Sequence, residues 1–339
     1  MKNIVFVILL AFAGVSFGQT VFSGIITENT WWTASNSPYI LTNDVVIAPD
    51  ARLVIEPGVT VLVERPTRIP EGIQQIDQLD SFTVSIKVYG AIYALGTPTN
   101  PIIFRGQDVK TENINTHWFG IFINSRRTQE ITIGYAIISS AANGIWVKNG
   151  RPMIRNTLFE FNNTGLRIEN RADVRAIHNI FSKNFLAGVR VLESNPFIFN
   201  SIFVDNNTIG LWGDGKAKID LRNNLFFNNG RNFSNTDPLF GIKSRVNANG
   251  DSTDFAGNMI ADPIFVGSVR EASMRAAGRP ERIPASQIIM NEINDNRRLY
   301  FLSPFSPAID AGVSDRMFRE PDGSLPDLGI WGGAEIIRF

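Results

Sequence analysis

The chain has 339 residues, of which 44% are hydrophobic and 19% are charged, and its 32 Lys and Arg balance its 32 Asp and Glu. This balance argues against the basic surface of a nucleic-acid-binding protein, and the absence of cysteine excludes disulfides, thiolate metal sites and cysteine nucleophiles. The two histidines, His117 and His178, are too few for a three-histidine zinc site.

The N-terminal segment has the pattern of a secretory signal peptide. Lys2 precedes an apolar run from Ile4 to Ala13, and small residues follow at Ser16 and Gly18. The pattern predicts a signal peptide over residues 1–18, because the run is shorter than the ~20 residues that span a membrane. We therefore expect a secreted, periplasmic or cell-surface protein with no transmembrane segment after cleavage.

The middle of the chain repeats with a period of 21 to 24 residues. Each repeat begins with a glycine and an apolar alternation, and the glycines are Gly120, Gly144, Gly165, Gly188 and Gly210. A second column holds Phe159, Phe181, Phe203 and Phe226. A small polar residue lies two positions before each Phe (Thr157, Asn179, Ser201, Asn224), and an asparagine lies three positions after it (Asn162, Asn184, Asn206, Asn229).

A chain wound into stacked coils explains such a period. Strands one coil apart pair in parallel at about 4.8 Å, so each side chain lies on its counterpart in the next coil. The Phe column would fill the interior, and the asparagines would bond backbone groups at the corners. The sequence therefore predicts an all-β solenoid of one domain.

Two of the repeats also carry a family resemblance. The runs Gly144-Ile-Trp-Val to Asn162-Asn and Gly188-Val-Arg-Val to Asn206-Asn resemble the right-handed, single-stranded parallel β-helix repeats of the pectin-lyase-like superfamily. The resemblance extends to Val45–Val61, Gly90–Phe104 and the closing motifs around Asp237, Asp262 and Asp327, and it covers nearly all of the mature chain. It implies the fold but no single activity, because this superfamily includes lyases, hydrolases, adhesins and proteins without a known reaction.

We expect three parts after the signal peptide within this one domain. Residues 19–43 would form an N-terminal cap with Trp31 and Trp32 as its lid, residues 44–232 the β-helix coils, and residues 233–339 loop-rich C-terminal coils and a closing segment. Residues 65–82 and 107–117 are predicted to loop out, and one short helix is predicted over residues 285–292.

Outward side chains form the candidate ligand site, because they too should stack in columns. Two positions after each glycine stand Phe122, Trp146, Arg167, Arg190 and Trp212, and the next outward column reads Asn124, Lys148, Glu169, Leu192 and Asp214. Sugar faces stack on indole rings, and guanidinium groups bind carboxylates or sulfates in pairs. The predicted ligand-binding residues are Trp146, Arg167, Arg190, Trp212, Glu169 and Asp214.

Three interpretations of this surface stay open. The column could bind a polysaccharide or cell-surface glycan without cleaving it, or Arg and Trp could stack on one another in a structural ladder of a rigid spacer. The alternative is a polysaccharide-active enzyme. A lyase is favoured over a hydrolase, and Arg167 or Arg190 would be its catalytic base. The paired aspartates of the family's hydrolases are not found.

The remaining polar motifs favour structural roles. Asn247, Asn249 and Asp251 place oxygen atoms at alternate positions, which suits Ca²⁺, although a plain polar turn explains them better; no other cofactor is expected. His178 precedes a corner asparagine and is interpreted as a substitute within an asparagine ladder. Asp310, Asp315 and Asp322 fit turns.

Overall fold

The computed structural model describes residues 18–65, 83–107, 117–126, 128–284 and 292–333. The predicted signal peptide, apart from Gly18, and the predicted helix, apart from Glu292, lie outside these residues. Within the described part, no helix is long and apolar enough to cross a membrane.

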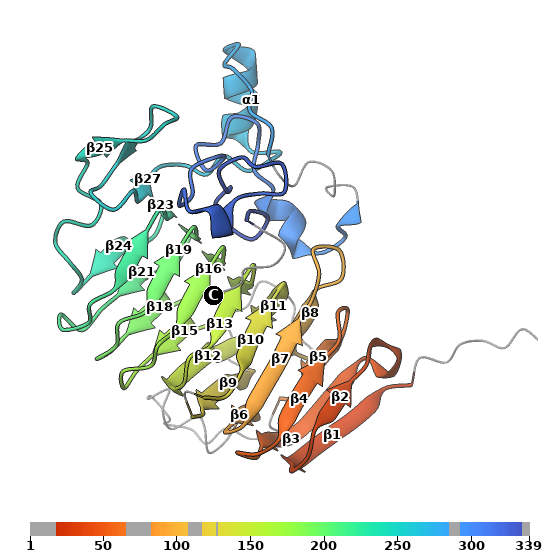
Figure 1. The fold of residues 1–339 in the computed structure, drawn as a ribbon. Helices are drawn as coiled ribbons and strands as arrows, with labels where there is room; N and C mark the ends of the chain where they lie inside the picture. The colour runs from red at the N-terminus through yellow and green to blue at the C-terminus, as the bar shows by residue number, and fades with distance from the viewer. Residues whose placement is uncertain (1–17, 66–82, 108–116, 127, 285–291, 334–339) are drawn as a thin grey trace, which may run out of the picture.

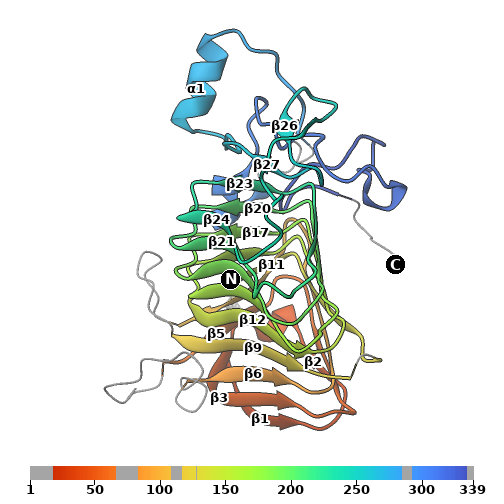
Figure 2. The same ribbon diagram turned by 90° about the vertical axis from the view of Figure 1, so that its left-hand side faces the viewer.

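The chain forms a parallel β-solenoid, whose coils rise from β1 at one end to β24 at the other (Figures 1 and 2). A 17-stranded and an eight-stranded parallel sheet enclose one apolar core. The predicted fold class is therefore confirmed. Each regular coil contributes one strand to the eight-stranded sheet and two to the larger sheet, so the solenoid has three faces.

The eight-stranded sheet is the first face. It consists of β2 (Thr30–Trp32), β4 (Arg52–Ile55), β7 (Ala91–Leu95), β10 (Ile131–Gly134), β13 (Met153–Arg155), β16 (Arg175–Ile177), β19 (Phe197–Phe199) and β22 (Asp220–Arg222).

The larger sheet supplies the other two faces. The tail face consists of β5 (Thr60–Val63), β8 (Ile102–Gly106), β11 (Ala136–Ser139), β14 (Leu158–Glu160), β17 (Ile180–Ser182), β20 (Ile202–Val204), β23 (Leu225–Phe227) and β27 (Met259–Ile260). The ladder face consists of β6 (Ser85–Val88), β9 (Trp118–Asn124), β12 (Ala141–Asn149), β15 (Thr164–Ile168), β18 (Ala187–Val191), β21 (Ile209–Trp212) and β24 (Arg231–Ser234). β1 (Thr20–Ile26) and β3 (Tyr39–Ile47) bend across both faces at the N-terminal end.

The interior repeats in register, as the sequence predicts. Phe159, Phe181, Phe203 and Phe226 are fully buried and stack with ring centroids 4.9, 4.9 and 4.4 Å apart. Each such pair adds about 0.5–1.5 kcal/mol beyond the area that it buries. Gly165 and Gly188 lie beside this stack, and a Cβ atom at either would come within 2.7 Å of a glycine carbonyl in the next coil. The glycines are therefore required by the close approach of neighbouring coils.

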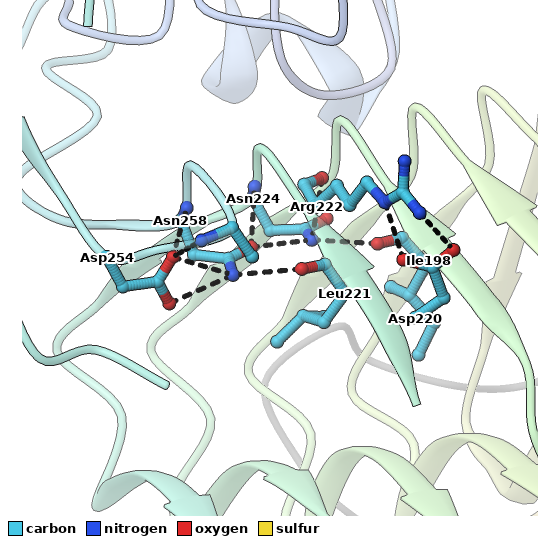
Figure 3. A network of polar contacts seen from close by, with 8 residues as sticks. Ile198, Asp220, Leu221, Arg222, Asn224, Asp254 and Asn258 are labelled. Atoms are coloured by element: carbon cyan, nitrogen blue, oxygen red, sulfur yellow. Dashed lines mark hydrogen bonds and ion pairs between the residues drawn. The ribbon is translucent and has the colours of Figure 1, made fainter. Parts of the chain in front are cut away.

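Two buried polar ladders hold the corners. In the first, the Oδ1 atoms of Asn184, Asn206 and Asn229 each accept the backbone N–H of the ladder asparagine one coil earlier. In the second, Thr157, Asn179, Ser201, Asn224 and Asn258 are joined in the same way. Figure 3 shows the end of this second ladder, where the carboxylate of Asp254 accepts hydrogen bonds from Asn258. Every polar ladder position therefore satisfies backbone groups that the corner leaves unpaired.

The N-terminal residues predicted as a cap form the first coil. β1 pairs in parallel with β3, and β2 pairs with β4. Trp32 is buried and stacks on Tyr39 at 4.7 Å, with Phe22 at its edge, so it closes the end of the core. Trp31 points outward and is 57% exposed. Alternation along a strand explains why only one of these neighbours covers the core.

The C-terminal segment, residues 292–333, packs outside the tail face. The outward column of that face is aliphatic (Ile137, Leu158, Ile180, Ile202, Leu225), and it forms a second apolar cluster with Tyr300, Leu302, Ile309, Leu328 and Ile330. Polar corner residues fasten the segment: Asn156 donates to the carbonyls of Ile330 and Gly332, and Asn223 donates to that of Ala311. The segment contains two 3₁₀ helices, η5 (Asn296–Tyr300) and η6 (Arg316–Phe318).

Between the coils and this segment lie smaller elements. A hairpin joins β25 (Arg245–Val246) to β26 (Ser252–Thr253), and helix α1 (Val269–Ala276) projects beyond the C-terminal end of the solenoid (Figure 1). Ser268 caps this helix by accepting the N–H of Glu271, whose carboxylate in turn accepts the N–H of Gly267. A third 3₁₀ helix, η1 (Ala34–Asn36), links β2 to β3.

Candidate functional site

The predicted outward column lies on the ladder face, one residue per coil. The strand register pairs Phe122 with Trp146, Trp146 with Arg167, Arg167 with Arg190, and Arg190 with Trp212. Lys87 precedes the column and Ser234 follows it. The four predicted residues Trp146, Arg167, Arg190 and Trp212 are therefore side by side on consecutive coils.

Both arginines stack on the indole rings. The guanidinium carbon of Arg167 lies 4.2 Å from the ring centroid of Trp146, and that of Arg190 lies 4.5 Å from the ring centroid of Trp212. The ring of Phe122 packs edge-on against Trp146 at 5.0 Å. One face of each indole is therefore already covered, and the structural ladder foreseen in the sequence is formed.

The two predicted carboxylates take different roles. Glu169 accepts a hydrogen bond of 2.6 Å from Nε of Arg167, and Arg167 is only 7% exposed, so this guanidinium is both stacked and ion-paired. Asp214 lies in a turn and accepts the backbone N–H groups of Glu193, Lys216 and Ala217. Burial would raise the pKa of Asp214, but these hydrogen bonds outweigh it and the pKa is lowered. Glu169 thus supports Arg167 in the row of Trp and Arg side chains, whereas Asp214 stabilises the turn that follows β21.

The second predicted column is wrong at Lys148. A register shift between Val147 and Asn149 places Asn149 opposite Asn124, and the two side chains share a hydrogen bond of 2.7 Å. The amide of Asn170 continues this row by donating to Asn149. One extra residue in a strand shifts which side chain lies opposite which residue of the neighbouring strand. The spacing of the repeats in the sequence does not reveal such a bulge.

The candidate calcium residues are engaged in a turn. The side-chain oxygen of Asn247 accepts the N–H groups of Asn249 and Asp251, and the amide of Asn249 donates to the carbonyl of Ile309. In the described part of the chain, no three His, Asp or Glu side chains are grouped to hold a metal ion. The hairpin is thereby fastened to the C-terminal segment.

His178 occupies the ladder position predicted for it. It shares left-handed backbone geometry with Asn156, Asn200 and Asn223, one coil apart, and its Nε2 lies 3.2 Å from the amide nitrogen of Asn200. Complete burial lowers its pKa to about 3. His117 is also buried, and its backbone N–H donates to the carbonyl of Ser140.

The segments 65–82 and 107–117, which are predicted to loop out, lie outside the described residues except at Arg65, Gln107 and His117. The structure adds two features that the repeats did not predict. Trp31 and Tyr93 are exposed in one outward column of the eight-stranded sheet, and Glu160 is buried between the tail face and the C-terminal segment. Glu160 stands in an outward column in the sequence, but its partner Asn296 is 136 residues away, so no local signal marks it.

Comparison with known proteins supports the fold. Residues 102–260 match the family model described as the right handed beta helix region. No curated protein and no solved structure matches the chain. The match lies on the coils that form the candidate column.

Proposed function

Because the chain is a right-handed parallel β-helix protein, we propose that it is exported and that its ladder face binds an extended acidic glycan without cleaving it. The observation that carries the proposal is the unbroken row of Trp146, Arg167, Arg190 and Trp212 on four consecutive coils. The row runs along the solenoid axis, as an extended polymer would.

Stacking prepares the arginines for such a ligand. A guanidinium held over an indole ring can still donate its N–H groups in pairs to a carboxylate or sulfate. Arg167 shares its Nε with Glu169, and Arg190 lies over Trp212 on the next coil, so the row places two guanidinium groups side by side. The indole edges of Trp146 and Trp212 then offer apolar contacts beside the charged groups.

Cleavage receives less support on this face. The alternative mechanism needs Arg167 or Arg190 as a base, but Arg167 donates to Glu169 through Nε, and a guanidinium held by a carboxylate keeps its protons. We therefore place the arginines in binding.

Polysaccharide binding by the purified full chain tests the proposal. We expect retention in affinity electrophoresis by polygalacturonate or a sulfated glycan, and weak retention by neutral dextran. Arg190→Ala and Trp212→Ala should each reduce the affinity about tenfold, the effect of one charge-assisted hydrogen bond or one buried contact. Tyr93→Ala is the matched control, because it removes an exposed aromatic ring from the eight-stranded sheet.

The outcomes separate the functions. Retention without turnover supports binding. The ultraviolet absorbance of an unsaturated uronate product would indicate a lyase, and new reducing ends without that absorbance would indicate a hydrolase. Unchanged retention in both ladder variants contradicts the proposed site, and no retention by any glycan leaves the spacer interpretation.

A further inference from the structure

A small cavity lies where η5 meets the tail face. Its volume is about 240 Å³, which is below the ~300 Å³ of the smallest drug-sized sites and suits a molecule of one ring. The apolar walls are Ile103, Ile137 and Phe161, and the polar ones include Ser139, Glu160 and Asn296. Arg105 and Asp295 also line it, and Arg105 is exposed.

Glu160 is the unusual group in this cavity. Its side chain is 2% exposed, and its Oε1 accepts a 2.8 Å hydrogen bond from the amide of Asn296. On its other side, Tyr300 donates to Ser182 at 2.9 Å and lies 3.4 Å from Oε2 of Glu160. No lysine or arginine in the described part of the chain forms an ion pair with Glu160.

The neighbouring cations do not pair with Glu160, and Arg105, which is exposed in the cavity lining, forms no ion pair with it. Asp295 also faces the cavity, and its own charge is matched by Arg297, whose Nη2 lies 2.7 Å from Asp295 Oδ2. Lys183 acts on Glu160 from the next coil, but its ammonium lies over the ring of Phe161 at 5.3 Å. A buried carboxylate without a paired cation is costly, so the cavity favours a ligand that brings a positive charge.

We propose that this cavity binds a small primary ammonium compound, of the size of one amino sugar, with its ammonium group on the carboxylate of Glu160. Asn296 holds Oε1 of that carboxylate, Tyr300 lies near Oε2, and Ser139 lies beside Glu160 on the neighbouring strand. The rings and methyl groups of Phe161, Ile103 and Ile137 pack on the carbon skeleton of the ligand. This site is separate from the ladder face and does not depend on glycan binding there.

Below the raised pKa of Glu160, the site should release a proton when an ammonium ion occupies it. Burial raises the pKa of Glu160; the hydrogen bonds from Asn296 and Tyr300 and the charge of Lys183 oppose this shift, and Asp295 adds to it. An ammonium ion favours the ionised form, so binding should tighten as the pH rises through the raised pKa. The Tyr300 hydroxyl stays protonated throughout, because burial and Glu160 raise its pKa.

Calorimetric titration of the full chain with glucosamine tests the proposal, with glucose and N-acetylglucosamine as neutral relatives of the same ring. We expect glucosamine to bind with a Kd on the order of 1 mM or below and the two neutral sugars to bind at least tenfold more weakly. At a pH below the raised pKa of Glu160, the measured heat should depend on the ionisation enthalpy of the buffer, because the bound ammonium displaces the proton of Glu160.

Two variants decide the site. Glu160→Gln keeps an acceptor for Asn296 and should abolish glucosamine binding. Arg105→Gln removes a positive charge from the cavity lining and should strengthen binding several-fold. Equal binding of glucose, binding that survives Glu160→Gln, or absence of glucosamine binding in the folded wild-type chain would each overturn the proposal.

Discussion

The tail face and the ladder face are built from the same coils but differ in what their outward columns require. Ile180 and Ile202 on the tail face need a cover, and the C-terminal segment supplies it. On the ladder face, Arg167 is buried and Arg190 half-buried without a covering segment from the described part of the chain: Arg167 lies over Trp146 and pairs with Glu169, and Arg190 lies over Trp212. The stacking of parallel coils therefore determines which residues fill the interior of the solenoid. The outward columns are not constrained in this way, so one can be covered by another segment while another stays at the surface.

A charge placed on each face gives the largest contrast. Ile202→Lys puts an ammonium group under the C-terminal segment at a position that is fully buried, and we expect it to lower the free energy of unfolding by about 3–5 kcal/mol. Trp212→Lys in the same repeat unit is the control and should cost about 1 kcal/mol, since it loses one cation–π contact. Denaturant unfolding measures both, and equal losses would contradict the difference between the faces.

The corner that joins the two faces should be the next most sensitive place. Asn206→Ala removes the acceptor of the Asn184 N–H and the donor to the Phe181 carbonyl, both buried, and should cost about 2–3 kcal/mol. Asn207→Ala, its exposed neighbour, should change stability by less than about 0.5 kcal/mol. A cost at Asn206 no greater than that at Asn207 would show that the ladder is incidental.

The pH dependence of stability isolates the corner that faces the C-terminal segment. His178 has a folded pKa of about 3 against an ordinary value of 6.5, so below 6.5 the unfolded chain binds a proton that the folded chain does not. Unfolding therefore becomes easier by about 1.4 kcal/mol for each pH unit as the pH falls from 6.5 toward 3, and the effect is absent above 6.5. His178→Asn supplies the residue found at Asn156 and Asn200, and its stability relative to wild type should rise by this slope on acidification.

Residues that repeat were predictable from the sequence, and residues that act once were not. Phe181 and Asn184 have counterparts one coil away, so their spacing marks both their position and their role. The row from Trp146 to Trp212 was predictable for the same reason. Lys148 was misplaced because a bulge leaves no trace in a period that already varies from 21 to 24 residues. Glu160 was missed because its partners, Asn296 and Tyr300, lie far along the chain in a segment without repeats.

The ladder that ends at Asp254 has a direction, which sets how the molecule can grow. The backbone N–H of each ladder residue donates to a side-chain oxygen in the next coil. An asparagine accepts such a bond through its Oδ1 and donates the next one through its own backbone N–H. An ionised carboxylate only accepts, so Asp254 closes the chain behind Asn258. A duplicated coil inserted within the ladder would have a hydrogen-bond donor on one side and an acceptor on the other. A coil added beyond Asp254 would meet a carboxylate, which has no proton to donate. Lengthening of this protein by repeat duplication is therefore directed to its middle.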